Sequence, residues 1–300
     1  MVYRSLKLLT LAQVVMGCWG VFSVPVAASC TTFASFNGES NSLLLAKNRD
    51  NRPDHQIIEV VATPGKFKYL ALSRQDVHDF VSAGINEKNL AVFNEVTIEY
   101  VAQAHGGIAD DFSRDILQNY TSAAAVIADL PKLVAKFPDP VFYQVADSQE
   151  LLSIEVAPQH KYRYKLVKRG VFAHTNNYQE SQLIAGYSYS STEDQLVSGS
   201  KVRLQRATDL SAGAHNLQQM QQIALDHSAG TTDSIYRLGA LPEPRSSKSL
   251  AFFGVQLTPH ENSRVVVNLY TVGEQYSYIL TPKFWDTYTA AYTVLVANGK

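Results

Sequence analysis

The sequence predicts a layered α+β fold in which two mainly antiparallel sheets pack on each other and helices cover them. Apolar runs of strand length occur near both ends of the 300-residue chain, and the helical patterns lie between them. Turn residues join neighbouring strand runs, as in antiparallel hairpins. Hydrophobic residues make up 46% of the sequence, which is enough for the buried interior that such layers need.

Turn signals mark the hairpins of the predicted sheets. Strands over residues 30–36 and 42–47 are joined by Asn37-Gly38, a dipeptide typical of tight hairpins. Strands over 57–62 and 67–72 are joined by Thr63-Pro64-Gly65. Short apolar runs predict further strands over residues 90–94, 141–146, 151–156, 250–257, 264–270 and 276–280.

Helical periodicity predicts the covering layers. Residues 110–137 are expected to form one long helix, which Pro138 ends. Two more helices are predicted over 201–210 and 217–224, with Ser200 as the N-cap of the first. The polar, serine-rich residues 187–200 are interpreted as a surface loop.

The first 29 residues have the pattern of a secretory signal peptide. Arg4 and Lys7 precede a long apolar stretch, and the small residues Ala27 and Ser29 lie just before Cys30. The apolar stretch is interrupted, whereas a membrane anchor needs about 20 clean apolar residues. We therefore expect cleavage after Ser29, a single mature domain over residues 30–300, and a periplasmic or secreted location.

Cleavage would make Cys30 both the first residue and the only thiol, because Cys18 lies in the signal peptide. A thiol has a pKa of about 8.5 and needs a base before it can attack an amide. A free α-amino group, with a pKa of about 7.7–8.0, can act as that base. Cys30 is therefore the candidate nucleophile and carries its own base.

Lipid attachment is the alternative interpretation of these cysteines. The residues before Cys18 and before Cys30 each loosely resemble a bacterial lipoprotein box. Lipidation of Cys18 would not exclude the enzymatic interpretation, but it would require a later cut before Cys30. A lipidated Cys30, in contrast, would have a blocked thiol and a blocked amine, which excludes the enzymatic interpretation. The protein would then be a lipid-anchored, non-enzymatic binding protein.

Residues 30–33, followed by Lys47-Asn48-Arg49-Asp50, resemble the N-terminal-nucleophile cysteine hydrolases of linear amides. This group includes choloylglycine hydrolases, penicillin V acylases and the isopenicillin-N acyltransferase family. Its nucleophile opens the first strand, and a basic-Asn-x-Asp motif closes the second. The resemblance implies that Asp50 holds the α-amino group of Cys30. It places Lys47 at a substrate-binding position where bile-salt hydrolases usually have arginine.

Three further segments resemble the same family in the same order. Residues 84–94 resemble its G-x-N-E-K-G-L strand, with Asn89 in place of glycine, and end at Asn94. Residues 172–178 resemble the H-T-N-H-F segment of the acyltransferase branch. The resemblance implies that Asn94 and Asn176 stabilise the oxyanion. Residues 200–207 resemble Ser-x-x-Arg-x-x-Arg-Ala, which implies an active-site role for Arg203.

The resemblance, closest to the acyltransferase-like branch, implies a four-layer αββα sandwich and a thioester acyl-enzyme. It implies no cofactor or metal, and the sequence contains no H-E-x-x-H motif and no Cys/His cluster. A net charge of −1 with no basic excess argues against a nucleic-acid partner. No segment after the signal peptide is apolar enough to span a membrane, and a homo-oligomer is left open.

The function expected from these features is hydrolysis of the linear amide bond of a small-molecule N-acyl substrate. The same site would act as an acyltransferase if an amine intercepted the thioester. A papain-type pairing of Cys30 with His174 is a further alternative, although a lone histidine in an apolar strand is more often a packed or hydrogen-bonded residue. The identity of the acyl amide is left open.

Overall fold

The computed structural model describes residues 30–38, 41–51, 54–77, 80–98, 108–239 and 247–296. The predicted signal peptide, residues 1–29, lies outside the described residues. The segment His105-Gly106-Gly107, whose sequence predicts a loop or a simple turn, lies outside them as well. Among the described residues, no helix is both long and apolar enough to cross a membrane.

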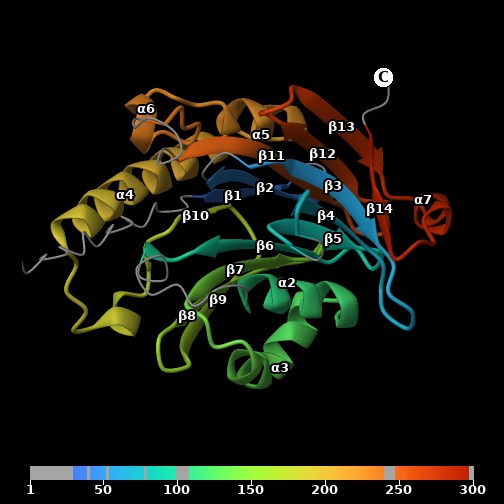
Figure 1. Ribbon diagram of the computed structural model, residues 1–300, viewed down its shortest axis with the longest axis horizontal. Helices are drawn as coiled ribbons and strands as arrows, with labels where there is room; N and C mark the ends of the chain where they lie inside the picture. Colours follow the sequence, from blue (N-terminus) through green and yellow to red (C-terminus); the bar gives the residue numbers. More distant parts are fainter. Residues whose placement is uncertain are drawn as a thin grey trace, which may run out of the picture.

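Two antiparallel sheets form the centre of the molecule (Figure 1). The first has the order β10-β1-β2-β11-β12-β13. Its strands are β1 (Thr31–Asn37), β2 (Ser42–Asn51), β10 (Val171–His174), β11 (Lys248–Leu257), β12 (Arg264–Leu269) and β13 (Glu274–Ile279). The second has the order β14-β3-β4-β5-β6-β7-β8-β9. Its strands are β3 (Gln56–Val61), β4 (Tyr69–Arg74), β5 (Ala83–Asn86), β6 (Ala91–Val96), β7 (Val141–Ala146), β8 (Leu151–Ala157), β9 (Lys161–Val167) and β14 (Tyr292–Val294).

Helices cover the outer face of each sheet, which gives four layers (Figure 1). The first sheet carries α4 (Ser191–Ser211), α5 (Leu217–Ala224) and the short α6 (Gly230–Asp233). The second carries α2 (Ile108–Asn119) and α3 (Ala123–Lys136). A 3-10 turn, η1 (Ser181–Ile184), follows β10, and α7 (Pro282–Thr287) precedes β14. The predicted αββα sandwich is confirmed.

Alternation of side chains along the strands builds the layers. On β2, Leu43 and Leu45 belong to the hydrophobic cluster between the two sheets. Leu44 and Ala46, which point the other way, pack in the cluster beneath α5. Because both faces of each strand are covered, β2 is buried along nearly its whole length.

The structure corrects two of the predicted helices. The helix expected over 110–137 is two helices, because Ser122 caps the start of α3 by accepting a hydrogen bond from the Ala125 N–H. Helix α4 begins at Ser191, within the predicted surface loop, where Ser190 and Glu193 form a capping box. The predicted N-cap Ser200 instead lies buried inside α4.

Edge strand β9 was not among the expected strands. Its sequence, KYRYKLV, places three cations on a mostly exposed strand at the border of the larger sheet. Charged side chains on an edge strand discourage pairing with strands of other chains. The following turn joins β9 to β10, the edge strand of the other sheet.

Candidate active site

Cys30 lies immediately before β1, and its side chain is buried. In the antiparallel β1–β2 pair Thr31 is opposite Asn48, so Cys30 lies beside the end of β2. The thiol donates to the main-chain oxygen of Asp50 at 3.9 Å. Cys30 is therefore adjacent to the motif that the sequence paired with it.

The Asp50 carboxylate is fully buried, and only one of its oxygens has a partner. Oδ1 accepts a 2.6 Å hydrogen bond from Ser249 Oγ. Oδ2 has no hydrogen-bond partner among the residues that the structure describes. Burial raises the pKa of Asp50 to about 6, and the charge of Arg237 is the strongest effect that opposes this rise. An unpaired carboxylate oxygen in this position can receive a cationic group.

Two buried arginines surround this carboxylate. Arg203, on α4, is 2% exposed and donates from Nη2 to Asn176 Oδ1 at 3.3 Å. Its pKa is lowered to about 10 by burial and by the charge of Arg237, while Asp50 and Cys30 act in the opposite direction. Arg237 is 7% exposed. Two of its guanidinium nitrogens, Nε and Nη1, have no hydrogen-bond partner within the described parts of the chain.

Arg237 is joined to Asp50 through Ser249. The Arg237 N–H donates to Ser249 Oγ at 2.9 Å, and the Ser249 N–H donates to the Arg237 carbonyl at 3.0 Å. Ser249 Oγ then donates to the carboxylate. Sequence reasoning missed Arg237, because no spacing rule connects it to residues near position 50. Its burial beside Asp50 is the signal that identifies it.

Gly199 allows α4 to approach α6 closely beside Arg203. A Cβ atom at this position would overlap with Asp233 Oδ1 and lie 3.0 Å from Asp233 Cγ. The same atom would lie 3.7 Å from Arg203 Nη1. Asp233 raises the pKa of Arg203 through its charge, although burial and the neighbouring Arg237 outweigh that contribution. Because residue 199 has no side chain, the Asp233 carboxylate can lie beside the buried guanidinium of Arg203.

Asn176 Nδ2 donates one hydrogen bond among the described residues, whereas Asn94 Nδ2 donates two. Asn176 Nδ2 donates to the Val96 carbonyl at 2.7 Å, and no second bond from this nitrogen occurs among the described residues. Asn94 Nδ2 donates to the Val81 carbonyl at 2.6 Å and to Ser113 Oγ at 3.0 Å. The geometry therefore favours Asn176 as an oxyanion donor, and a role for Asn94 stays a prediction.

Lys47 connects the two sheets through the interior. Its ammonium donates to the Ser82 carbonyl at 2.8 Å, to Ser82 Oγ at 2.9 Å and to the Asn94 carbonyl. A fourth acceptor, Asn94 Oδ1, lies 3.4 Å from the same nitrogen, so the acceptors outnumber the three N–H bonds of the ammonium group. Lys47 is fully buried, and its hydrogen bonds connect β2 to β6. A contact of Lys47 with substrate stays a prediction.

The residues of this site fall within a match to a known protein family. Residues 36–240 match the family model of acyl-coenzyme A:6-aminopenicillanic acid acyltransferase. The chain belongs to this family. The match begins after Cys30 and includes Lys47, Asp50, Asn94, Asn176, Arg203 and Arg237. A comparison with curated proteins found no match.

Solved structures share the fold of this acyltransferase-family chain. A mutant of the conjugated bile acid hydrolase from Clostridium perfringens is 12% identical, with a TM-score of 0.57 over 90% of this chain and 97% of the other. A second variant of that hydrolase has a TM-score of 0.55, 12% identity and the same coverage of both chains. Penicillin V acylase from Agrobacterium tumefaciens is 14% identical, with a TM-score of 0.52 over 85% of this chain and 89% of the other. The resemblance inferred from the sequence is confirmed.

Among the described residues, the candidate active site contains no histidine that could act as a partner for Cys30. Both ring nitrogens of His174 are engaged, Nδ1 with the Thr175 carbonyl at 2.6 Å and Nε2 with Glu155 at 2.7 Å. A papain-type base needs a ring nitrogen that can take the thiol proton. The geometry therefore gives no support to a Cys30–His174 pair.

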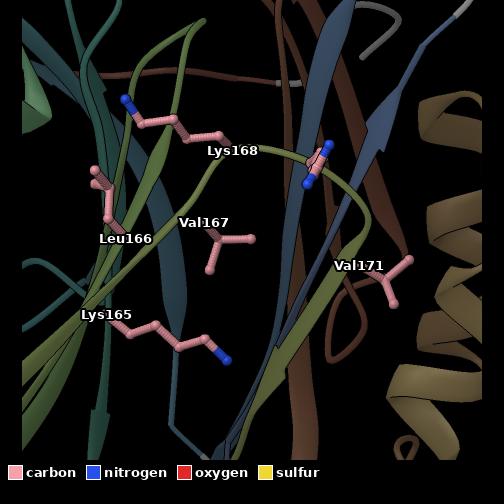
Figure 2. Close-up of a pocket in the computed structure, with 6 residues that line it drawn as sticks. Lys165, Leu166, Val167, Lys168 and Val171 are labelled. Atoms are coloured by element: carbon pink, nitrogen blue, oxygen red, sulfur yellow. The ribbon is translucent and has the colours of Figure 1, made fainter.

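A cavity of about 660 Å³ opens at the turn between β9 and β10, outside the family site. Figure 2 shows the side chains around it, which are Lys165, Leu166, Val167, Lys168, Arg169 and Val171. Val171 pairs with Ser35, whereas His174, nearer the nucleophile, pairs with Thr32. The cavity therefore lies toward the end of β1 that is farther from Cys30, and none of the predicted site residues lines it.

Proposed function

We propose that this member of the acyltransferase family is an N-terminal cysteine amidohydrolase whose mature chain begins at Cys30. The proposal rests on one observation: Oδ2 of the buried Asp50 has no hydrogen-bond partner among the described residues, and the main-chain oxygen of Asp50 accepts the Cys30 thiol. Cleavage before Cys30 would create an α-ammonium group beside this carboxylate. A buried carboxylate is stabilised in its charged form by such a cation.

The first half of the proposed reaction forms a thioester. The neutral α-amine of Cys30 accepts the thiol proton, and the thiolate sulfur attacks the amide carbonyl carbon. The second amide N–H of Asn176 donates to the resulting oxyanion. The α-ammonium then gives its proton to the leaving nitrogen, the carbon–nitrogen bond breaks, and an amine departs. Asp50 holds the α-amino group throughout these transfers.

The second half restores the enzyme. The α-amine, again neutral, takes a proton from a water molecule whose oxygen attacks the thioester carbonyl. The carbon–sulfur bond breaks, the sulfur regains a proton from the α-ammonium, and a carboxylic acid leaves. No cofactor or metal is needed, because all four proton transfers use the α-amino group.

Acyl transfer is the second candidate function, and the name of the matching family favours it. An amine would replace water as the group that attacks the thioester, and a new amide would leave instead of an acid. The solved structures with the same fold are named as a conjugated bile acid hydrolase and a penicillin V acylase, which supports hydrolysis as the first candidate. Adding a primary amine to the assay separates the two, because only a transferase converts most of its acyl-enzyme to the new amide.

The proposal includes export of the protein, with residues 1–29 acting as a signal peptide. Intact-mass spectrometry of protein purified from the full-length gene tests this directly. A chain that begins at an unmodified Cys30 supports the proposal. A diacylglyceryl or N-acyl adduct at Cys30 would reject it, because the amine and the thiol would both be blocked. Cys18→Ala is the matched control, since this cysteine should be lost with the signal peptide.

The substrate class is tested with a panel of linear N-acyl amides. Purified mature protein is incubated with penicillin V, an N-acyl homoserine lactone, a glycine-conjugated bile salt, an N-acyl amino acid and a fatty amide. We expect amine release from at least one of them, together with an acyl adduct on Cys30. Cys30→Ala should abolish both signals. Undiminished hydrolysis by Cys30→Ala would reject the nucleophile assignment.

A further inference from the structure

A buried ion pair links the two sheets on the side of the site where Asn176 lies. His174 ends β10 of the first sheet, and Glu155 lies on β8 of the second. His174 Nε2 and Glu155 Oε1 are 2.7 Å apart, and their side chains are 1% and 5% exposed. Removing two charged groups from water costs free energy. The proposed reaction uses neither group, so the pair needs another explanation.

The hydrogen-bond partners of His174 favour the imidazolium form, in which both ring nitrogens donate. Nδ1 faces the carbonyl of Thr175 at 2.6 Å, and a carbonyl can only accept. Nε2 faces a Glu155 oxygen that already accepts a main-chain N–H. Burial opposes the charged form, but the hydrogen bond to Glu155 and the charges of Glu95 and Glu155 outweigh it and raise the pKa of His174. Both ring nitrogens therefore donate.

Glu155 also holds the turn that follows Asn176. Its Oε1 accepts from the Gln179 N–H at 2.7 Å, and its Oε2 accepts from the Glu180 N–H at 3.0 Å. Together with the imidazolium, these donors give a buried carboxylate three hydrogen bonds. One carboxylate thus fixes both the strand end before Asn176 and the turn after it.

Asn176 itself is held by groups from two other elements. Its side chain donates to the Val96 carbonyl at the end of β6, and the Ile98 N–H donates to its main-chain oxygen at 3.1 Å. Arg203 of α4 donates to its Oδ1. These contacts orient the amide plane of Asn176. Glu155 and His174 fix the position of the main chain on either side of Asn176.

We propose that Glu155 and His174 are positioning residues that place the Asn176 amide for oxyanion stabilisation. This inference rests on the proposed function, and the two residues touch no reacting atom. A displacement of about 1 Å at such a donor costs on the order of 10²-fold in rate. The Glu155 carboxylate keeps Asn176 in place because it accepts hydrogen bonds from His174, before Asn176, and from the main-chain N–H groups of Gln179 and Glu180, after it.

The test is Glu155→Gln, which keeps the size of the side chain but presents an NH₂ group where donors already point. We expect kcat on the hydrolysed amide to fall by about 10–100-fold with KM within about twofold, since losing an oxyanion donor costs about 10²–10³-fold. Glu155→Gln added to Asn176→Ala should lower kcat by less than about twofold more. Full additivity of the two changes would overturn the proposal, because residues acting through Asn176 cannot act without it.

Glu150→Gln is the matched control, because Glu150 precedes β8 and pairs with Lys168 at 3.0 Å, away from Asn176. It should leave kcat unchanged. If Glu155→Gln does not fold, Glu155→Asp keeps the charge and shortens the reach. A kcat for Glu155→Asp within about twofold of wild type would then overturn the proposal.

Hydrogen exchange separates this inference from the proposed function. Peptides containing Gln179 and Glu180 should exchange faster in the Glu155 variant than in wild type and in Glu150→Gln. Unchanged exchange would overturn the positioning role whether or not the protein is an amidase. A wild-type protein that hydrolyses no amide but shows the faster exchange in the variant would overturn the proposed function alone.

Discussion

Ser249 Oγ donates a 2.6 Å hydrogen bond to Asp50 Oδ1 across 199 positions of sequence and leaves Asp50 Oδ2 unpaired among the described residues. The contact brings β11 to the end of β2, where the register between the two strands shifts at Ser249. One carboxylate oxygen is thereby fixed, and the other remains available to the α-amino group of the proposed nucleophile.

Ser249→Ala should shift the acid limb of the pH–activity profile to higher pH. A hydrogen bond to the charged carboxylate lowers its pKa, so removing the bond raises the pKa of Asp50 above its value of about 6. Since the proposed mechanism needs an ionised Asp50, kcat/KM should begin to fall at a higher pH as the solution is acidified. The measurement is kcat/KM from pH 4.5 to 8. Ser35→Ala is the control, because Ser35 bonds the Ala214 carbonyl instead.

Arg237→Gln should shift the acid limb of the pH–activity profile to higher pH by more than Ser249→Ala does. The positive charge of Arg237 is the strongest effect that lowers the pKa of Asp50, ahead of the hydrogen bond from Ser249. The matched control is Arg206→Gln, which removes a guanidinium that is paired with Asp226 near the surface. An acid limb that stays in place in Arg237→Gln would show that this arginine does not act on Asp50.

Gly199→Ala should weaken both stability and turnover. The added Cβ would overlap with Asp233 and force that carboxylate to move relative to Arg203, and overpacking of this kind costs about 1–3 kcal/mol of unfolding free energy. Urea unfolding and kcat measure the two effects. Gly213→Ala is the control, because its nearest neighbour, the Leu210 oxygen, is 4.0 Å from the added atom. Equal behaviour of the two variants would contradict the close approach of Asp233.

Asn94 and Asn176 should differ in what their loss affects. Asn176→Ala removes the amide hydrogen that has no partner among the described residues, so kcat should fall by about 10²–10³-fold. Asn94→Ala removes three internal hydrogen bonds, two donated by Nδ2 and one that Oδ1 accepts from Lys47, each worth about 0.5–1.5 kcal/mol, so it should lower the unfolding free energy more than it lowers kcat. The two variants are compared by steady-state kinetics and urea unfolding. A larger kcat loss in Asn94→Ala would restore Asn94 as the main oxyanion donor.

Local sequence signals predicted much of this fold because they act within a few residues. The two strands β1 and β2 pair from Thr31 to Asn37 as expected, but Asn37 itself pairs with Ser42, so residues 38–41 connect the strands and the tight turn predicted at Asn37-Gly38 is wrong. Asn89 adopts a φ of 61°, which explains why asparagine can stand where the family usually has glycine. The start of α4 was also signalled locally, by the capping box of Ser190 and Glu193, which the interpretation as a loop overlooked.

The sequence by itself determined the layered class and the family resemblance, because hairpin turns, strand alternation and short motifs report on neighbouring residues. Only the tertiary structure decided which polar groups are buried together. Arg237 beside Asp50, Lys47 between the sheets and Glu155 against His174 each join residues far apart in the chain. Their roles depend on burial, which strengthens electrostatic interactions and penalises unpaired groups, and burial exists only once the layers have packed.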